Sequence, residues 1–427
     1  MSGPARGVFR ALRNRNFRIW SAGALVSNLG AWMQRIAQDW LVLTQLTHHD
    51  PRAVGLVTAL QFAPQLLLVA WTGSAADHFD RRRMLMITQA AMSALALGLG
   101  LLTITGVVRA WHVYAFAFLL GCVAAFDAPA RQTFVADMVG EDDLSNAVAL
   151  NSTSFNTSRL IGPAISGLVI AAVGSGWTFL INAASFVAVL ASLLLMRREA
   201  LHPRERSGRR QGGIVEALRY VGRRPDLTAL LIMLFLFGSL GLNFPVFISS
   251  MAVSVFHVGA QGFGLLTSAM AVGTVTGAVL AARRERPAIP LIVAGAAVFG
   301  VGYTLAALAP SYVLFGAALA LVGVASQTVS TPTVSLVQMT TEPAMRGRVV
   351  ALMMTIALGG QPIGAPFVGW VAHALGPRWA VAVGALAGFL AAAVGLRYLI
   401  RHRGLRVHLV SRRLRLSLDK GDPSTPR

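Results

Sequence analysis

MRREALHPRERSGRRQGG (196–213) is the one long polar interruption in an otherwise apolar chain, and it divides the sequence into two halves. On each side, the apolar residues fall in blocks of about 20, the length of an α-helix that crosses ~30 Å of hydrocarbon. Only 13% of the residues are charged, whereas soluble proteins have roughly 25%. The sequence therefore predicts an all-α membrane protein, and blocks of this length exclude an outer-membrane barrel, whose strands alternate over about 10 residues.

Twelve apolar blocks predict twelve transmembrane helices, six on each side of the polar stretch. The expected spans are 17–45, 53–76, 84–106, 111–130, 145–172, 176–196, 227–254, 262–282, 288–308, 311–336, 347–373 and 377–399. We expect an N-terminal six-helix bundle over 1–198, a cytoplasmic linker over 199–226, a C-terminal six-helix bundle over 227–403 and a basic cytoplasmic tail over 404–427.

The linker has an apolar pattern of its own. Ile214, Leu218 and Val221 fall on one face of a helix, which is typical of a short amphipathic helix lying on a membrane surface. A merely solvated linker is the alternative.

The net charge of +20 lies almost entirely in the segments on one side of the twelve-span arrangement. Only Arg52, Arg109 and Arg378 fall on the other side. By the positive-inside rule, both termini are cytoplasmic, which requires an even number of spans. This distribution favours membrane orientation and lipid contact over nucleic-acid binding. MSGPARGVFRALRNRNFRIW (1–20) precedes a long span without a clear cleavage site, so it predicts a first helix and not a removed signal peptide.

The two halves resemble each other, as expected of a transporter built by duplicating a bundle. NAVALNSTSFNTSRLIGPAISG (146–167) aligns without a gap with RVVALMMTIALGGQPIGAPFVG (348–369), matching Gly162 with Gly364 and Gly167 with Gly369. A weaker echo sets VGLVTALQFAP (54–64) against FGLLTSAMAVG (263–273).

The inventory of reactive residues argues against an enzyme. Lys420 is the only lysine, so no phosphate-binding loop with its lysine is present. The nine histidines are scattered, and Cys122 is the single cysteine, so no spacing indicates a metal site or another cofactor. Energy for any transport must come from an ion gradient, a substrate gradient or a separate partner.

GSAADHFDRRR (73–83), at the end of the second span, carries the strongest local signal. With the six-plus-six organisation, it resembles the loop motif of the major facilitator superfamily: Gly73, Asp77, Arg81 and Arg82 match, while Asp80 replaces the usual second glycine. FRALRNRNFRIW, AQDWLVLTQL, FDAPARQTFVADMV and NTSRLIGPAISG resemble one bacterial branch, that of the enterobactin exporter and the macrolide-efflux proteins.

This resemblance implies a gate. In the state closed to the cytoplasm, it places Asp77 at the start of the eleventh span, near Arg346 and Arg348, and pairs Arg81 with Asp127 of the fourth span. A carboxylate is stabilised at a helix N-terminus by ~0.3–2 kcal/mol, so such a contact is physically reasonable. The alternative is a tight turn whose arginines serve only to orient the chain in the membrane.

SRLIGPAISG (158–167) resembles the fifth-span motif that the superfamily associates with antiport. Gly162, Pro163 and Gly167 match, and the second half offers Gly364, Pro366 and Gly369. Proline bends a helix and small residues allow close packing, so these positions are expected at a kinked helix interface. Generic small-residue packing is the alternative.

Charged residues inside the spans are functional by default. Arg35 and Asp39 stand one helical turn apart and predict an i, i+4 ion pair, and Arg159 lies midway along the fifth span. These three residues are the candidates for proton coupling; the alternative for Arg35 and Asp39 is an interfacial pair. Ala117 occupies the place where proton antiporters of the superfamily often carry an arginine. The candidates for the substrate cavity are Asn28, Trp32, Asn243, Phe244 and Gln327.

The sequence as a whole predicts a secondary transporter in a bacterial cytoplasmic membrane. We expect it to need no cofactor and to act as a monomer. We expect it to export an amphipathic small molecule (a drug, a macrolide or a siderophore-like compound) by proton antiport and alternating access. The membrane part of an ATP-driven exporter with a separate ATPase, and a non-transporting receptor or scaffold, are the alternatives.

Overall fold

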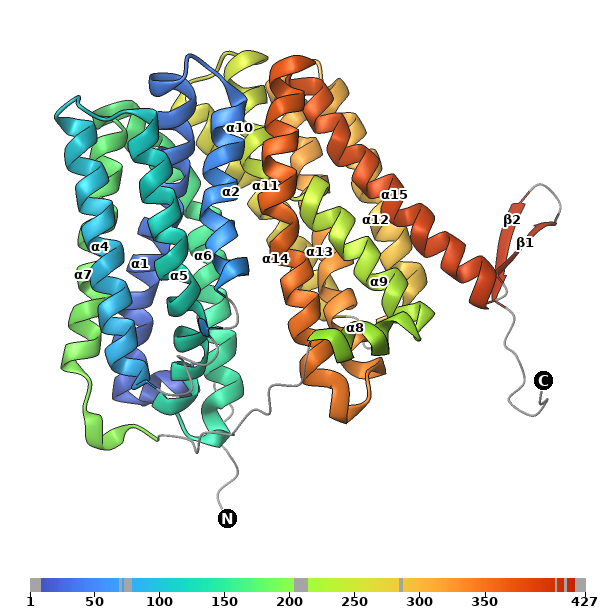
Figure 1. Ribbon diagram of the computed structural model, residues 1–427, viewed down its shortest axis with the longest axis horizontal. Coiled ribbons are helices and arrows are strands. Elements are labelled where there is room, and N and C mark those ends of the chain that lie inside the picture. The colour runs from blue at the N-terminus through green and yellow to red at the C-terminus, as the bar shows by residue number, and fades with distance from the viewer. Residues whose placement is uncertain are drawn as a thin grey trace.

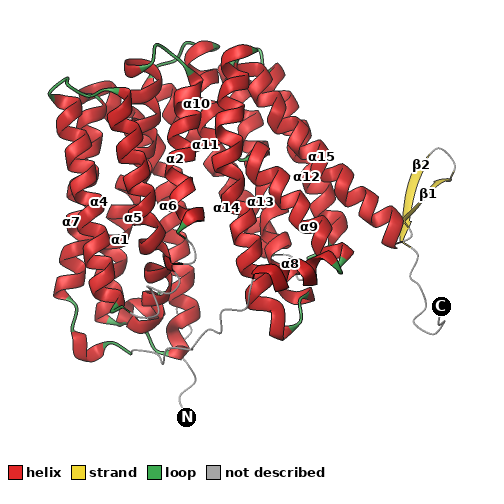
Figure 2. Cartoon of the chain, viewed as in Figure 1, coloured by secondary structure: helices red, strands yellow, loops and turns green. Residues whose placement is uncertain are grey.

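The computed structural model describes residues 9–68, 71–72, 79–202, 214–283, 287–403, 405–410 and 413–418. Apart from one terminal hairpin, the regular structure in these residues is helical (Figures 1 and 2). The elements of the first half are η1 (Arg10–Arg13), α1 (Arg15–Trp40), the π-helix η2 (Leu41–Leu46), α2 (Pro51–Leu67), α4 (Arg81–Ile104), α5 (Ala110–Met138), α6 (Glu141–Val173), α7 (Ser175–Leu195) and η3 (Arg198–Ala200).

The second half repeats this succession of long helices. Its elements are α8 (Ile214–Gly222), α9 (Pro225–Leu236), the π-helix η4 (Phe237–Gly241), α10 (Phe244–Ser254), α11 (Ala260–Ala282), α12 (Ile289–Leu308), α13 (Tyr312–Thr340), α14 (Pro343–Ala374) and α15 (Pro377–Arg403). Strands β1 (Leu405–Val410) and β2 (Arg413–Leu418) pair antiparallel at its end.

Local chemistry fixes where several helices begin and end. The side chains of Asn14, Asp50 and Asp80 accept hydrogen bonds from backbone N–H groups in the first turns of α1, α2 and α4. These are N-caps, which satisfy donors that the helix itself cannot. Gly174 (φ 89°) and Gly376 (φ 101°) form the turns before α7 and α15, in a backbone region that favours glycine.

Ten helices in the described part of the chain are long and apolar enough to cross a membrane. They include α4 to α7, α9 joined to α10, and α11 to α15. The helix α1 is not among them because of its polar side chains, among them Gln34, Arg35, Gln38 and Asp39. Of α2, the structure describes 17 residues.

The helices form two groups that lie side by side (Figure 1). In the first group, α1 packs on α6 and α7, α4 packs on α5 and α7, and α2 packs on α5. In the second group, α12 packs on α13 and α15, and α11 packs on α13. Two pairs of helices join the groups: α2 with α14, and α6 with α11.

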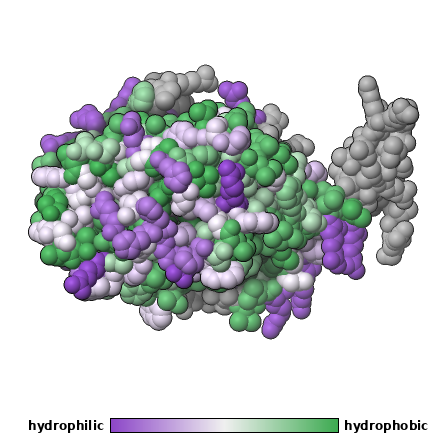
Figure 3. All heavy atoms as spheres, turned by 90° about the horizontal axis from the view of Figure 1, so that it is seen from above, coloured by the Kyte–Doolittle hydropathy of each residue, from purple (hydrophilic) through white to green (hydrophobic). Residues whose placement is uncertain are grey.

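The molecule has two ends of different character. Helix ends near Arg15, Arg81, Arg197 and Arg346 lie at one end, called the basic face here; the turns at 47–50, 105–109, 255–259 and 309–311 lie at the other end, the far face. Figure 3 views the molecule from the far face, where hydrophilic side chains gather across the middle and apolar ones lie along much of the rim.

Large apolar side chains are exposed on the sides of many helices, among them Ile87, Leu308, Val313 and Ile363. Exposed apolar surface on this scale is unfavourable in water but is expected of helices that contact lipid.

Three local features differ from the sequence expectations. The span expected to end at residue 130 continues as α5 to Met138, because Asp127 and Asp137 are both paired and buried. The linker contains the short helix α8, in which Ala217 and Val221 are buried and Leu218 is exposed; the side chain of Ile214 lies outside the described residues. The tail, expected only to be basic, contains the hairpin of β1 and β2.

Candidate functional site

Close contacts between the two groups seal the far-face half of the molecule. A Cβ on Gly55 of α2 would clash with the backbone carbonyl of Ala365 in α14, and a Cβ on Gly264 of α11 would clash with that of Pro163 in α6. Only glycine allows these backbones to approach so closely. The two glycines are aligned with each other in the weaker sequence echo, and residues 163 and 365 are aligned in the stronger one.

A second pair of glycines repeats this symmetry nearer the far face. A Cβ on Gly167 would lie 2.6 Å from the carbonyl oxygen of Ala260, and a Cβ on Gly369 would lie 3.0 Å from that of Pro51. These contacts again join α6 with the start of α11 and α14 with the start of α2. The two joints are therefore related by the internal duplication, as expected for two bundles around a pseudo-two-fold axis.

The other two glycines expected at helix interfaces lie within the groups. A Cβ on Gly162 would meet the Cβ of Trp32 in α1, 2.8 Å away. One on Gly364 would clash with the carbonyl of Ser239 in the π-helix η4. Pro163 and Pro366 lie inside α6 and α14, beside the glycine contacts that join the groups.

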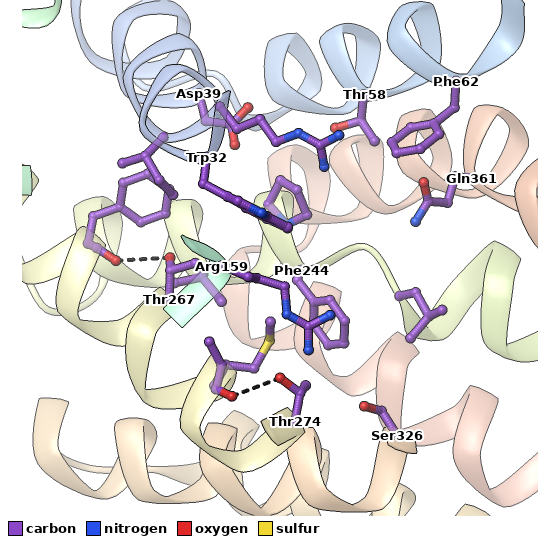
Figure 4. A pocket seen from close by; sticks show the side chains of 18 of the residues that line it. Trp32, Asp39, Thr58, Phe62, Arg159, Phe244, Thr267, Thr274, Ser326 and Gln361 are labelled. Carbon is purple, nitrogen blue, oxygen red and sulfur yellow. Dashed lines mark hydrogen bonds between the residues drawn. The ribbon is translucent and has the colours of Figure 1, made fainter. Parts of the chain in front are cut away.

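A cavity of about 270 Å³ lies between the two groups on the inner side of these joints (Figure 4). The first group lines it from α1, α2 and α6; the second lines it from α10, α11, α13 and α14, and Leu242. Its wall is mainly aromatic and aliphatic, with Phe62, Phe244 and Ile248 as examples, and hydroxyl and amide groups are set into it at Thr58, Thr274, Ser326, Gln327 and Gln361. Such a wall suits an amphipathic ligand.

Three charged side chains line this cavity: Arg35, Asp39 and Arg159. The guanidinium of Arg35 lies 4.9 Å from the centroid of the Trp32 ring, in a cation–π arrangement. Asp39 is 8% exposed. The predicted ion pair between Arg35 and Asp39 is absent from the structure, although both residues are described, because the arginine turns to the indole ring instead.

Arg159 enters the cavity from α6 (Figure 4). Its Nε and Nη2 atoms are buried and have no hydrogen-bond partner within the described part of the chain. Leaving a buried donor unpaired costs about 1–3 kcal/mol, and more for a charged group. This arginine is therefore available to a ligand.

A second, more polar cavity of about 480 Å³ adjoins the first and shares Arg35 and Phe62 with it. It lies within the first group and extends along α5 and α6 to Arg131 and Asn151, in the halves of these helices that lead to the basic face. Together, the two cavities extend from between the groups toward the basic face, while the glycine contacts hold the groups together nearer the far face.

Asp127 lines this second cavity. Its carboxylate accepts hydrogen bonds from Thr88 (2.7 Å), Gln89 (2.7 Å) and Arg131 (2.9 Å). The guanidinium of Arg131 also lies 5.6 Å from the centroid of the Trp20 ring.

In this structure Arg81 pairs with Asp137, and the pair with Asp127 that the resemblance implies for the state closed to the cytoplasm stays a prediction. Its Nη1 lies 2.7 Å from Oδ1 of Asp137, and both side chains are largely buried. Because α5 continues past residue 130, Asp137 comes level with the start of α4 at the basic face, whereas Asp127 lies deeper. Arg82 donates to the backbone carbonyl of Leu193 at the end of α7 (2.8 Å).

The remaining gate residues are placed only in part. Gly73 and Asp77 lie outside the described residues. Arg346 is exposed, and Arg348 forms an ion pair of 2.8 Å with Glu216 of α8. The short linker helix is thus held against the start of α14.

Four of the five cavity candidates line the cavities: Asn28 the polar one, and Trp32, Phe244 and Gln327 the one between the groups. The prediction for Asn243 is wrong: it is fully buried, lines neither cavity, and donates to the carbonyl of Ser239 at 2.6 Å. Sequence reasoning missed Asp137 and the polar wall residues Thr58, Thr274 and Gln361. The sequence signal that could have identified these residues is a polar side chain within an otherwise apolar helix.

The far face carries a small ionic cluster between the groups. Asp50, in the turn before α2, pairs with Arg52 (2.7 Å) and lies 3.4 Å from Nδ1 of His373 near the end of α14. Partial burial raises the pKa of the Asp50 carboxyl, but the hydrogen bonds and charge of Arg52, with the charge of His373, outweigh it, so this pKa lies below its ordinary value.

Two groups of long apolar helices enclose a cavity whose mainly apolar wall carries hydroxyl, amide and charged side chains. This arrangement is typical of membrane transporters of the major facilitator kind. A family model described as transmembrane secretion effector matches residues 6–412. The chain therefore belongs to this family of the major facilitator superfamily, which confirms the resemblance seen in the sequence, and its class is that of a transporter and not an enzyme.

The relatives of the chain are bacterial transporters. The staphyloferrin A transporter of Staphylococcus aureus is 30% identical over 58% of this chain, and the match spans 62% of that relative's length. The multidrug efflux pump Tap of Mycolicibacterium fortuitum is 28% identical over 83% of this chain and 88% of its own. Among solved structures, a bacterial homologue of the human lysosomal transporter Spinster, inward-facing and occupied, superposes with a TM-score of 0.72 at 15% identity, over 90% of this chain and 96% of its own.

Proposed function

We propose that the protein is a proton-coupled exporter of an amphipathic small molecule in a bacterial cytoplasmic membrane. The observation that carries this proposal is the mixed apolar and polar cavity between the two helix groups, closed toward the far face by the glycine joints. Two relatives, a multidrug efflux pump and an enterobactin exporter (Citrobacter koseri, 24% identical over 83% of this chain), support export of a drug-like or siderophore-like compound.

In this proposal, twelve helices cross the membrane, both termini are cytoplasmic, and residues 1–198 and 227–403 act as two bundles of one monomer. The basic face is then the cytoplasmic side, so substrate enters from the cytoplasm. Cysteines at Glu199 and Val107, each in a Cys122→Ser background, should react with an impermeant thiol reagent only from the inside and only from the outside, respectively. Reaction of both from one side would contradict this topology.

Alternating access follows if the bundles rock about the cavity. The joints between α2 and α14 and between α6 and α11 would open at the far face while the basic face closes. Because the two joints are symmetric, one rigid-body motion can open both.

Asp39 is the proposed proton carrier. Its carboxylate is buried in the cavity wall and carries no ion pair with Arg35, while two cationic side chains line the same space. A nearby cation favours the ionised carboxylate and desolvation favours the protonated one, so a change of conformation can load and release a proton.

The decisive experiment is uptake into inverted vesicles with an imposed pH gradient, using dyes, macrolides and siderophores in turn. Uptake should depend on the gradient and be lost with Asp39→Asn, while downhill exchange of the same substrate persists. A protonophore added with ATP maintained distinguishes this mechanism from a separate ATPase: uptake that survives the protonophore contradicts proton antiport. Gradient-driven uptake unchanged in Asp39→Asn would remove this residue from the mechanism.

A further inference from the structure

The charges of the cavity between the groups do not balance. Two guanidinium groups, Arg35 and Arg159, face one carboxylate, Asp39, in a space otherwise lined by neutral side chains. Arg35 has the π-face of Trp32 as a partner. Arg159 has none: two of its nitrogens are buried without an acceptor within the part of the chain that the structure describes.

The hydroxyl groups on the opposite wall do not supply that acceptor. Thr267 donates to the carbonyl of Phe263 (3.0 Å) and Thr274 to that of Ala271 (2.8 Å) (Figure 4). Ser326 donates to the carbonyl of Gly323 (2.8 Å), so each hydroxyl is held by its own helix. No hydrogen bond joins any of these hydroxyls to Arg159. A charged donor that stays unpaired inside a membrane protein is costly, and such residues mark ligand pathways.

The surroundings of Arg159 define the shape of the missing partner. A guanidinium presents parallel N–H donors that match the two oxygens of a carboxylate, sulfonate or phosphate. Phe244 and Met270 line the same cavity and offer apolar surface to the rest of the ligand. The space of about 270 Å³, with the adjoining cavity, suits a small molecule and not a peptide chain.

We propose that this cavity binds amphipathic anions, with Arg159 as the residue that holds the anionic group. The inference rests on the proposed function, because the bound anion is taken to be the transported substrate. It narrows the substrate class to molecules that carry an acidic group on an apolar body.

Equilibrium binding to the purified full-length protein tests this proposal with two probes of the same ring system. One is the anion 8-anilinonaphthalene-1-sulfonate, and the other is its uncharged counterpart N-phenyl-1-naphthylamine. Energy transfer from tryptophan reports binding of both, because Trp32 lines the cavity. Arg159→Gln should weaken binding of the anion at least about tenfold and change that of the neutral probe less than about twofold.

Three further variants make the result specific. Arg159→Lys keeps the charge and should retain most of the affinity for the anion. Arg52→Gln removes one positive charge outside the cavity and should change neither probe. Thr274→Asp places a carboxylate on the wall opposite Arg159, where it would pair with Arg159 from within the protein, and should abolish binding of the anion only. If Arg159→Gln does not fold, the Thr274→Asp variant decides.

The proposal is overturned if the wild-type protein does not bind the anion, or if Arg159→Gln and Thr274→Asp bind the anion as tightly as the wild type. Binding requires no gradient, so its outcome is separate from the transport assay. Charge-selective binding without gradient-driven uptake would overturn proton antiport alone. Gradient-driven uptake without charge-selective binding would overturn the anion site alone.

Discussion

Arg81 and Arg82 are neighbours at the start of α4, and each serves a different contact. Arg81 reaches Asp137 at the end of α5, and Arg82 reaches the last carbonyls of α7. Together they fasten three helices of the first group at the basic face. The resemblance to the superfamily singles out these arginines, whereas the acidic partner of Arg81 in this structure depends on where α5 ends, which hydropathy alone places too early.

The ion pair between Arg81 and Asp137 should contribute measurably to stability. Its side chains are 19% and 9% exposed, so we expect either Arg81→Gln or Asp137→Asn to lower the free energy of unfolding by about 1–3 kcal/mol, between the values for surface and buried pairs. A double-mutant cycle in mixed micelles should show coupling between these two residues. The matched cycle of Arg81→Gln with Asp127→Asn should show coupling near zero. Strong coupling between Arg81 and Asp127 would instead support the pair that the resemblance implies.

Asp50 should make the far face sensitive to acid. Its folded pKa lies below its ordinary value of 3.8, so the stability it contributes is present above that value and is lost as the pH falls through the folded pKa. Arg52→Gln removes the main cause of the lowered pKa and brings the folded pKa toward its ordinary value, so the loss of stability on acidification should become smaller. Melting temperatures measured from about pH 3 to pH 6 check this. Arg109→Gln, which removes a charge from the same face, is the control, and identical profiles would exclude the effect.

At the scale of elements, the four inter-group helices act as two copies of one joint. Gly55 and Gly264 each lie against a carbonyl of the opposing helix, at positions related by the sequence echoes. The turns before α2 and α11 also repeat: the N–H of His49 donates to the carbonyl of Leu43, and that of Val258 donates to that of Ala252. An echo that apolar helices could produce by chance thus corresponds to matching backbone contacts.

Substituting either glycine of the joint should push the two groups apart at the far face. Gly55→Val and Gly264→Val each place side-chain atoms where a carbonyl lies, and overpacking of this kind costs about 1–3 kcal/mol. We expect both variants to increase the reactivity of a cysteine at Thr58 toward an impermeant thiol reagent added from the far face. Gly140→Val, at a site with no atom within 4 Å, is the control. An effect of only one joint variant would contradict the symmetry.

How far the sequence predicts this molecule depends on the physical origin of each feature. Apolar blocks predicted the helices because lipid requires the backbone hydrogen bonds to be satisfied within each segment. Of the residues singled out within those blocks, Trp32 and Gln327, expected at a cavity, and Arg159, expected to take part in proton coupling, line the cavity between the groups. Asn243 does not line the cavity as predicted, because a hydrogen bond to the carbonyl of Ser239 holds its amide inside the second group. The alternation of apolar and basic residues in LRVHLV and RLRLSL is typical of β-strands and fits the terminal hairpin, whereas composition alone indicates only a basic tail.

At the scale of the whole molecule, transport requires that the far face open, so a permanent link across it must stop the cycle. Asp50 belongs to the first group and His373 to the second, and their side chains meet at 3.4 Å. In a Cys122→Ser background, cysteines at both positions joined by a short, cleavable bifunctional thiol reagent should reduce uptake at least about tenfold, because the barrier to separating the groups becomes covalent. Cleaving the linker should restore uptake. Equilibrium binding of a probe should persist in the linked protein, since the path to the cavity runs toward the basic face. Each single cysteine treated with the same reagent is the control for modification alone. Undiminished uptake by fully linked protein would show that the far face need not open, and alternating access between these two groups would be wrong.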